Sequence, residues 1–330
     1  MTLITFGPIP SRRLGRSLGI NHIPRRVCSY DCVYCQLGAK DFKQTRRESF
    51  HSPSAIVEIV SERVRELESA NEAIDYLTFV PNGEPTLDAG LGKAIVALRS
   101  LGKPIAVITN ASMLWMADVR HALAQADWVS VNVDAVDPGI WQQINAPAPD
   151  LNLEEILDGV LEFASSYAGT LTSETMLVRG VNDGEAHCRS LALFLARVSP
   201  AIAYVATPTR APREAWVEPP NEEALTRAFQ VIAEHVPRAE LLIGQEGNAF
   251  ASSDDPAADI LAITAVHPLR EAVVREILSR TNTDWAVVQR LLDERLIRRT
   301  DYRGCVFFVR TPRFHGHAEE PTPEDRAPDR

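Results

Sequence analysis

The chain has 330 residues, of which 45% are apolar and 24% are charged, and its formal net charge is −10 at pH 7. It contains no apolar run near the roughly 20 residues that cross a bilayer, which excludes a membrane-spanning protein. The negative charge excludes non-specific attraction of the whole chain to nucleic acid, and leaves local basic patches as the place to look for such contacts.

The N-terminal stretch "MTLITFGPIPSRRLGRSLG" has no apolar segment followed by a small-residue cleavage site, and its basic residues follow its apolar ones. This order is the reverse of a secretory signal, so we expect a cytoplasmic protein. A reducing cytosol disfavours structural disulfides. The chain has five cysteines, so at least one would stay unpaired however the others were bonded.

Short apolar or β-branched runs predict strands, and the amphipathic stretches between them predict helices. The expected strands are 17–23, 76–80, 105–110, 128–135, 173–178, 201–208 and 240–244, and the expected helices lie near 53–69, 88–100, 113–125, 152–167, 184–198 and 221–235. Strict alternation indicates parallel strands with right-handed crossovers. Six repeats fall short of the eight that close a barrel. We therefore expect an α/β fold, a partial (β/α)6 TIM-like barrel over residues 1–251.

After about Asp254 the pattern changes to three predicted helices and a hairpin across "RRTDYRGCVFFVR", with Arg303-Gly304 at its turn. This is the element order of a winged helix-turn-helix domain, expected at 255–313. Arginines outnumber acidic residues seven to three between 290 and 313, so the domain is a candidate for nucleic-acid phosphates and, equally, for a protein or peptide. Residues 314–330 are polar and rich in proline and acid, which predicts a disordered tail.

The stretch "VCSYDCVYCQLG" places Cys28, Cys32 and Cys35 in a C-x3-C-x2-C spacing just after the first expected strand. Three interpretations compete. A structural zinc site needs four ligands, and the fourth would have to come from a residue such as His22 or His51, since no second C-x2-C is present. Reactive thiols need an activating partner that is not evident. A [4Fe-4S] cluster held by three cysteines leaves one iron open to bind another molecule.

This stretch resembles the cluster loop of the radical S-adenosylmethionine (SAM) superfamily, in which an aromatic residue precedes the last cysteine, as Tyr34 does here. The resemblance implies that the open iron chelates the amino and carboxylate groups of SAM, and that Tyr34 also contacts SAM. It also implies an electron from a flavodoxin- or ferredoxin-type donor. SAM is then cleaved to a 5′-deoxyadenosyl radical, which abstracts hydrogen from the substrate.

The stretch "NGEPTL" follows the second expected strand and resembles the Gly-Gly-Glu-type motif that receives the SAM ammonium group in this superfamily. The resemblance implies contacts from Gly83, Glu84 and Pro85, while Asn82 stands where a glycine is common. Glycine lets the backbone approach a ligand closely, and a carboxylate accepts from an ammonium. The alternative is that this stretch is an ordinary turn.

Two further stretches complete the expected SAM site. "SVNVDA" places Ser130, Asn132 and Asp134 on one face of the fourth strand, since alternate residues share a side. The resemblance assigns this strand end to the ribose and carboxylate of SAM, and Arg179, near the end of the fifth strand, to the region of the adenine. A solvated strand face is the alternative for the polar residues on the fourth strand.

The stretches "FGPIPSRRLGRSLGIN" and "CVYCQLG" resemble a narrower group, related to the wyosine-type tRNA-modifying synthases, over most of residues 4–251. Those synthases hold a second cluster on extra N-terminal cysteines. No cysteine precedes Cys28 here, so their ring-forming reaction is not implied.

Arg12, Arg13 and Arg16 precede the first expected strand and are candidates for an anionic substrate, such as an RNA phosphate, a nucleotide or a carboxylate. Ion pairs with the acidic surface are the alternative. The sequence predicts a radical SAM enzyme acting on an unidentified substrate, either a tRNA or nucleotide or a peptide. The alternative function is an iron–sulfur regulator that binds DNA through the winged helix.

Overall fold

The main element of the protein is a mostly parallel sheet of eight strands, in the order β1-β2-β5-β6-β7-β8-β9-β10. The structure, a computed structural model, describes residues 4–23, 27–38, 42–242, 255–265 and 268–311. β1 is antiparallel to β2, and every other neighbouring pair is parallel. The strands are β1 (Thr5–Ser11), β2 (Gly15–Ile20), β5 (Tyr76–Phe79), β6 (Ile105–Thr109), β7 (Trp128–Asn132), β8 (Thr170–Met176), β9 (Ile202–Ala206) and β10 (Ala239–Leu242).

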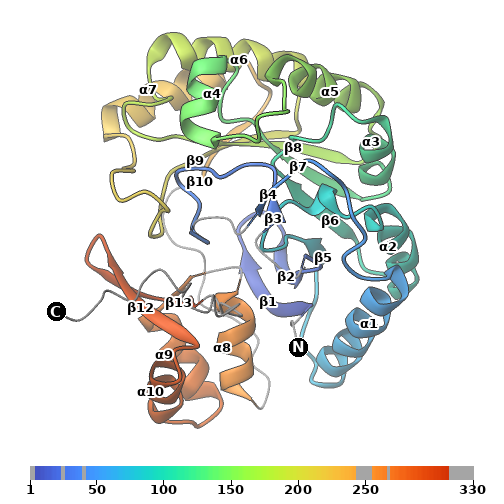
Figure 1. Cartoon of the computed structure of the whole chain (residues 1–330), viewed down its shortest axis with the longest axis vertical. Coiled ribbons are helices and arrows are strands. Elements are labelled where there is room, and N and C mark those ends of the chain that lie inside the picture. The colour runs from blue at the N-terminus through green and yellow to red at the C-terminus, as the bar shows by residue number, and fades with distance from the viewer. Residues whose placement is uncertain (1–3, 24–26, 39–41, 243–254, 266–267, 312–330) are drawn as a thin grey trace, which may run out of the picture.

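Helices connect successive parallel strands and form an outer layer around the sheet (Figure 1). They are α1 (Pro53–Ser69), α2 (Leu91–Leu98), α3 (Ala117–Leu123), α5 (Leu153–Ser166), α6 (Glu185–Val198) and α7 (Glu222–Ala233). The side chains of Ser52, Asn152 and Asn221 cap α1, α5 and α7 by accepting from first-turn amides. The predicted α/β class and the alternation of strands and helices are confirmed.

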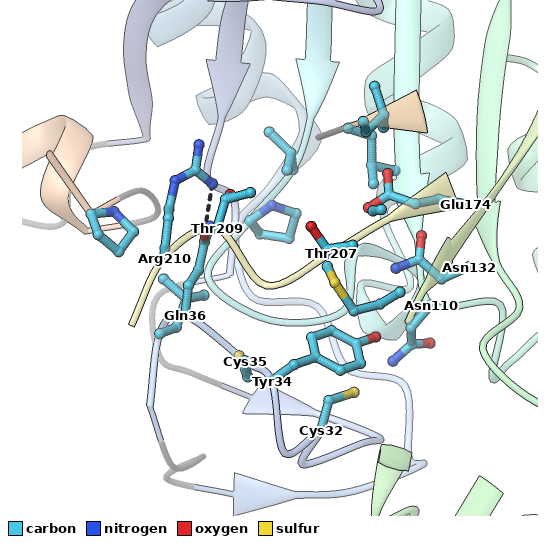
Figure 2. Close-up of a pocket in the computed structure, with 18 of the residues that line it drawn as sticks. Cys32, Tyr34, Cys35, Gln36, Asn110, Asn132, Glu174, Thr207, Thr209 and Arg210 are labelled. Atoms are coloured by element: carbon cyan, nitrogen blue, oxygen red, sulfur yellow. Dashed lines mark hydrogen bonds between the residues drawn. The ribbon is translucent and has the colours of Figure 1, made fainter. Parts of the chain in front are cut away.

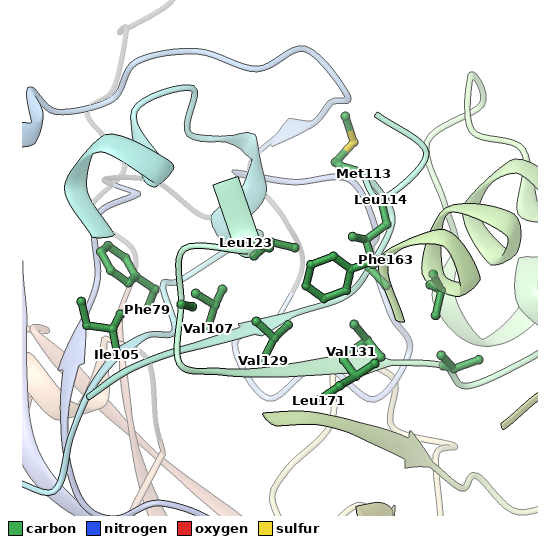
Figure 3. Close-up of a cluster of buried hydrophobic side chains, with 14 of the residues drawn as sticks. Phe79, Ile105, Val107, Met113, Leu114, Leu123, Val129, Val131, Phe163 and Leu171 are labelled. Carbon is green, nitrogen blue, oxygen red and sulfur yellow. The ribbon is translucent and has the colours of Figure 1, made fainter. Parts of the chain in front are cut away.

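The main hydrophobic core lies between the sheet and this helical layer. Val107, Val129 and Leu171 project from neighbouring strands toward Phe163 of α5 (Figure 3). Because successive strand residues point to opposite faces, their neighbours in sequence, such as Ser130, face the inner side of the sheet. The helices thereby shield one face, and the other is left to form a site.

Several elements were not predicted. β1 contains Pro8 and Pro10, which lack an amide to donate, and such residues are tolerated on an edge strand. The helix α4 (Pro138–Asn145) is short, and its N-terminus is capped by Asp137, whose Oδ1 accepts from the amide of Ile140 at 2.9 Å. The short strands β3 (Val27–Cys28) and β4 (Phe42–Lys43) pair with one another in parallel.

The C-terminal unit, residues 256–310, contains α8 (Pro256–Thr264), α9 (Glu271–Arg280), α10 (Ala286–Asp293) and a sheet of β11 (Leu269–Arg270), β13 (Cys305–Arg310) and β12 (Ile297–Tyr302). Arg303 and Gly304 form the hairpin turn with φ of +50° and +74°, the left-handed pair typical of a type I′ turn. Phe6 and Ile9 of β1 belong to the hydrophobic core of this unit, which fastens it to the sheet edge.

Residues 252–254, at the expected boundary between the two parts of the chain, and the expected tail 314–330 lie outside the described residues. Within the described ranges, none of the helices combines the length and the apolarity that a bilayer crossing requires.

Candidate cofactor-binding site

The loop that carries the three cysteines is anchored on α4. The amides of Asp31 and Val33 donate to the carbonyls of Asn145 and Ile144, each at 3.0 Å. The amide of Cys35 donates to the carbonyl of Cys32 at 3.0 Å, which closes a tight turn. These bonds hold the loop in place through its backbone, so its thiols can project toward the inner side of the sheet.

Cys28, Cys32 and Cys35 all line one cavity of about 340 Å³. Figure 2 shows Cys32, Cys35 and Tyr34 on one side of it, across from Asn132 and Glu174, which come from strands. Strand ends and following loops supply Val80, Pro81, Gly83, Glu84, Ile108, Thr109, Asn110, Asn132, Glu174, Met176, Ala206, Thr207, Thr209, Arg210 and Leu242. The predicted convergence of the cysteine loop and the strand ends is therefore present.

The arrangement of the three thiols determines which kind of metal centre they could hold. Within the described ranges, no three His, Cys, Asp or Glu side chains gather as a single metal ion would require. A cubane cluster instead binds each thiolate at a different iron, so its ligands stand apart around one space. Three thiols lining a common cavity fit such a cluster.

Two side-chain amides donate to the cysteine sulfurs. Asn110 Nδ2 lies 3.5 Å from Cys28 Sγ, and Asn145 Nδ2 lies 3.4 Å from Cys32 Sγ. Hydrogen bonds to ligand sulfurs orient them and tune the potential of an iron–sulfur centre. Neither residue was predicted from the sequence; the only signal was the position of Asn110 at the end of the expected strand 105–110.

Tyr34 is fixed to Asp134 rather than left free in the cavity. The Tyr34 hydroxyl donates to Asp134 Oδ2 at 2.5 Å, and Asn145 Nδ2 donates to the same oxygen at 2.7 Å. Asp134 Oδ1 accepts from the amide of Met176 at 2.8 Å. Asp134 lies just past β7, is 3% exposed and does not line the cavity. Its carboxylate therefore ties the cysteine loop to the ends of β7 and β8.

Burial shifts the titration of this group of side chains. Desolvation raises the pKa of Asp134 to about 6, and the bonds from Tyr34, Met176 and Asn145 act in the opposite direction. Desolvation, followed by the charge of Asp134, raises the pKa of the Cys32 thiol. A buried thiolate at this position thus needs a positive partner, which an iron centre supplies.

Gly83 and Glu84 form the turn after β5 and lie against the cysteine loop. A Cβ at Gly83 would meet the Val27 carbonyl oxygen at 2.0 Å, so only glycine fits. Glu84 is 1% exposed, and its carboxylate accepts four bonds from its own chain. The donors are the Thr86 amide at 3.0 Å, the Thr86 hydroxyl at 2.5 Å, the Thr109 hydroxyl at 2.6 Å and the Asn110 amide at 2.8 Å.

Through these four hydrogen bonds, Glu84 holds the turn after β5 to the end of β6, a role that the sequence did not predict. The Glu84 side chain also lines the cavity. Desolvation raises the pKa of Glu84, and its hydrogen bonds from Thr109, Thr86 and Asn110 oppose that shift. Pro85 is buried, lies outside the cavity lining and accepts from His22 Nε2 through its carbonyl at 3.3 Å.

Ser130 and Asn132 point to the same side of β7, as predicted, but at different depths. Asn132 lines the cavity, and its Oδ1 is buried without a hydrogen-bond partner. A buried carbonyl oxygen in this state is a ready acceptor for a bound ligand. Ser130 is fully buried, does not line the cavity, and its hydroxyl also has no partner.

The arginines predicted to contact substrate or SAM differ in whether they line the cavity. Arg12 and Arg13 line the cavity, and Arg13 forms an ion pair with Glu174. Arg16 instead pairs with Glu72 outside the cavity. Arg179 also lies outside the lining, in an exposed ion pair with Glu218. Glu174 was missed because the strand pattern alone gives no sign that a carboxylate is needed on the inner face.

The C-terminal unit supplies one wall of the cavity through Pro268, Leu269, Arg270, Val273 and Phe307. The Tyr302 hydroxyl, at the tip of the β12–β13 hairpin, donates to the carbonyl of Pro208 at 3.4 Å. The unit thus packs against the mouth of the sheet at two places, an arrangement that the sequence did not predict.

The sequence matches a known protein family and a relative that spans most of its length. The family model described as the Radical SAM superfamily matches residues 23–191, just over half of the chain. The UPF0026 protein MJ1312 of Methanocaldococcus jannaschii is 44% identical over 309 residues, which cover 93% of this chain and 96% of that protein.

Two solved structures share the fold at low sequence identity. A structure of TYW1 with a lysine-pyruvate adduct bound superposes with a TM-score of 0.52 at 16% identity, over 67% of this chain and 74% of that one. Streptococcus suis SuiB bound to the precursor peptide SuiA gives a TM-score of 0.51 at 12% identity, over 69% of this chain and 49% of that one.

Proposed function

The chain belongs to the radical SAM superfamily, and from that premise we propose that Cys28, Cys32 and Cys35 hold a [4Fe-4S] cluster beside SAM. The observation that carries the proposal is that the three thiols line one cavity with Gly83 and Asn132. Three protein ligands leave the fourth iron of a cubane without a protein ligand, which is where SAM would bind.

When reduced by a flavodoxin- or ferredoxin-type donor, the bound cofactors would supply a 5′-deoxyadenosyl radical that abstracts hydrogen from the substrate. The chain's own residues position these cofactors. Asn110 and Asn145 donate to two cysteine sulfurs, and Gly83 lets the backbone approach the cluster loop. The unpartnered Asn132 Oδ1 would accept from a hydroxyl or ammonium of SAM.

Under this proposal, the remaining predicted SAM contacts divide into two groups. Tyr34, Glu84 and Asp134 act mainly by holding the loops around the cofactor, since each is bonded within the chain. Pro85, Ser130 and Arg179 lie outside the cavity lining, and we assign them no direct contact with SAM. Of the three substrate candidates, Arg12 and Arg13 keep that role and Arg16 does not.

We also propose that the sheet is a half-open (β/α)6 barrel spanning residues 1–251, that residues 255–313 form a winged helix, and that the enzyme is cytoplasmic. The barrel mouth and the winged helix would enclose the substrate together, whether tRNA, nucleotide or peptide. The contact between Tyr302 and Pro208 supports the enzyme over a DNA-binding regulator, because a hairpin tip seated on the barrel is not presented to a groove.

The test is an anaerobic reconstitution of the full chain, followed by an iron count and measurement of 5′-deoxyadenosine after reduction with SAM present. We expect about four irons per chain and 5′-deoxyadenosine release. Replacing any one of Cys28, Cys32 and Cys35 with Ala should abolish both. Cys188→Ala is the matched control, because Cys188 is buried in α6, away from the cavity. Full iron content in Cys32→Ala would refute the ligand assignment.

A further inference from the structure

The cavity lining contains more positive than negative side chains. Among the described residues, Arg12, Arg13, Arg210 and Arg270 line it together with two carboxylates, Glu84 and Glu174. We propose that Arg270 and the arginine-rich wall around it bind an oxyanion of the substrate, a phosphate or a carboxylate. This inference rests on the proposed function and adds a chemical class to its substrate.

Both of these carboxylates are already engaged within the chain. Glu84 accepts four hydrogen bonds from Thr86, Thr109 and Asn110. Glu174 forms an ion pair with Arg13. Neither is therefore available to balance the charge of Arg270, and a low-dielectric cavity strengthens the attraction of a remaining cation for an anion.

Arg270 is held in place by an aromatic ring rather than by an acid. Its guanidinium carbon lies 5.3 Å from the centroid of Phe307, a fully buried residue of the same wall. This is a cation–π contact, and a guanidinium carries its N–H donors in a planar fork that suits bidentate contact with an oxyanion. Among the described residues, no carboxylate forms a salt bridge with Arg270; the neighbouring Glu271 pairs with Arg275.

Two more guanidiniums lie at the same cavity. Arg210 Nη1 donates to Gln36 Oε1 at 2.6 Å, a contact drawn in Figure 2, and Arg12 Nη2 donates to the Leu242 carbonyl at 3.3 Å. These bonds keep both side chains at the lining, where their charges add to that of Arg270. A substrate oxyanion would thus meet donors from β1–β2, from the loop after β9 and from the C-terminal unit.

The position of these arginines in the chain separates them from the cofactor machinery. Arg12, Arg210 and Arg270 all lie outside residues 23–191, the segment that the superfamily model matches. The cysteine loop, the Gly83 turn and Asn132 lie inside it. Contacts outside the shared segment are suited to what differs between members, which is the substrate, rather than to the cofactor that they have in common.

The inference is tested with inorganic phosphate and acetate as probes, each titrated into the cluster-loaded full chain with and without saturating SAM. Wild type is compared with Arg270→Gln, Arg270→Lys and Arg280→Gln. Arg280 lies on the same helix α9, pairs with Glu276 and does not line the cavity, so it is a control of equal charge change that leaves the Glu271–Arg275 pair intact. Circular dichroism and iron content establish that each variant is folded and loaded.

We expect Arg270→Gln to raise the Kd of the preferred probe by roughly tenfold to a hundredfold, because charge-assisted hydrogen bonds are lost. Arg270→Lys should fall between that variant and wild type, and Arg280→Gln should match wild type. Tighter binding of phosphate or of acetate identifies which oxyanion the substrate carries. SAM should leave the Kd unchanged.

Equal weakening in Arg270→Gln and Arg280→Gln, or wild-type binding in Arg270→Gln, would overturn the inference. Competition between SAM and the probe would also overturn it, since the arginine would then receive the carboxylate of the cofactor. The proposed function fails separately: a chain that binds phosphate through Arg270 but neither holds a cluster nor releases 5′-deoxyadenosine would refute that function alone.

Discussion

The hydroxyl of Tyr34 donates to Asp134 Oδ2 at 2.5 Å, although 100 residues separate the two in sequence. This bond connects the loop that carries the cysteines to the end of β7, and Asn145 extends the connection from Asp134 to Cys32 Sγ. The position of the thiols therefore depends on a buried polar network as well as on the fold of the loop itself.

Tyr34→Phe should weaken this network. Asp134 would lose a donor while remaining buried, which costs about 1–3 kcal/mol of unfolding free energy. We also expect faster loss of iron on exposure to a chelator, because the loop is held less firmly. Tyr167→Phe is the control: it removes a bond of 2.8 Å to the Ala126 carbonyl, remote from the cavity. Equal iron loss in the two variants would show that the Tyr34 bond does not hold the cluster loop.

Gly83→Ala should displace the cysteine loop. The new methyl group would lie 2.0 Å from the Val27 carbonyl oxygen, a backbone atom that cannot move without Cys28. We expect a lower iron content and a lower midpoint of thermal unfolding. Gly184→Ala is the matched control, since a Cβ there meets nothing within 4 Å and its φ is −71°. Wild-type iron content in Gly83→Ala would contradict the close packing of the two loops.

Glu84→Gln tests whether this carboxylate organises the site. The substitution replaces one carboxylate oxygen of Glu84 with an NH2 group. The Thr109 hydroxyl and the Asn110 amide donate to different oxygens of this carboxylate, so at least one buried hydrogen bond is lost. We expect destabilisation of about 1–3 kcal/mol and reduced iron content, in addition to weaker SAM binding. An exposed exchange, Glu185→Gln, should leave all three unchanged. If Glu84→Gln lost only SAM affinity, the carboxylate would serve the ligand and not the loop.

We expect His22 to make the stability of the folded chain depend on pH. Burial lowers its pKa to about 4 from an ordinary value of 6.5, so the folded chain keeps the ring neutral. Its contribution to stability is full above pH 6.5 and is lost as the pH falls toward 4, because the unfolded chain takes up the proton first. Between pH 7 and 5.5 the loss is about 1 kcal/mol.

The loss is measured by urea unfolding of wild type, His22→Gln and the exposed control His121→Gln. Burial raises the pKa of Asp88 to about 6, and that shift acts in the opposite direction, so the difference between variants is the informative quantity. His22→Gln should lose less stability than wild type over this interval, and His121→Gln should follow wild type. Parallel curves for wild type and His22→Gln would contradict the assignment of a buried neutral ring.

The sequence predicted the elements whose signal is local. Periodic apolar runs gave the parallel strands and the six connecting helices, and Gly304 marked the hairpin turn. β1 was missed because its prolines are tolerated only at a sheet edge, which sequence does not reveal. The sequence also does not show which residues on the inner face of a strand reach the cavity. Ser130 and Asn132 share a face, but only Asn132 lines the cavity.

The part of the candidate site that lies within one short sequence motif, the three cysteines, could be predicted from the sequence. Partners that come from distant elements were not predictable. Asn145 lies on a short helix that the apolar pattern did not predict, and Arg270 reaches the cavity only because the C-terminal unit packs on β1 through Phe6. Such contacts depend on how elements dock, which residue spacing along the chain does not determine.

The most direct test of the central claim, a cluster with one iron available to SAM, is electron paramagnetic resonance of the reduced, reconstituted chain before and after SAM is added. The account predicts a [4Fe-4S] signal whose shape changes on addition of SAM, in wild type and in Cys188→Ala alike. A cluster signal that SAM leaves unaltered, at SAM concentrations that saturate binding, would contradict it.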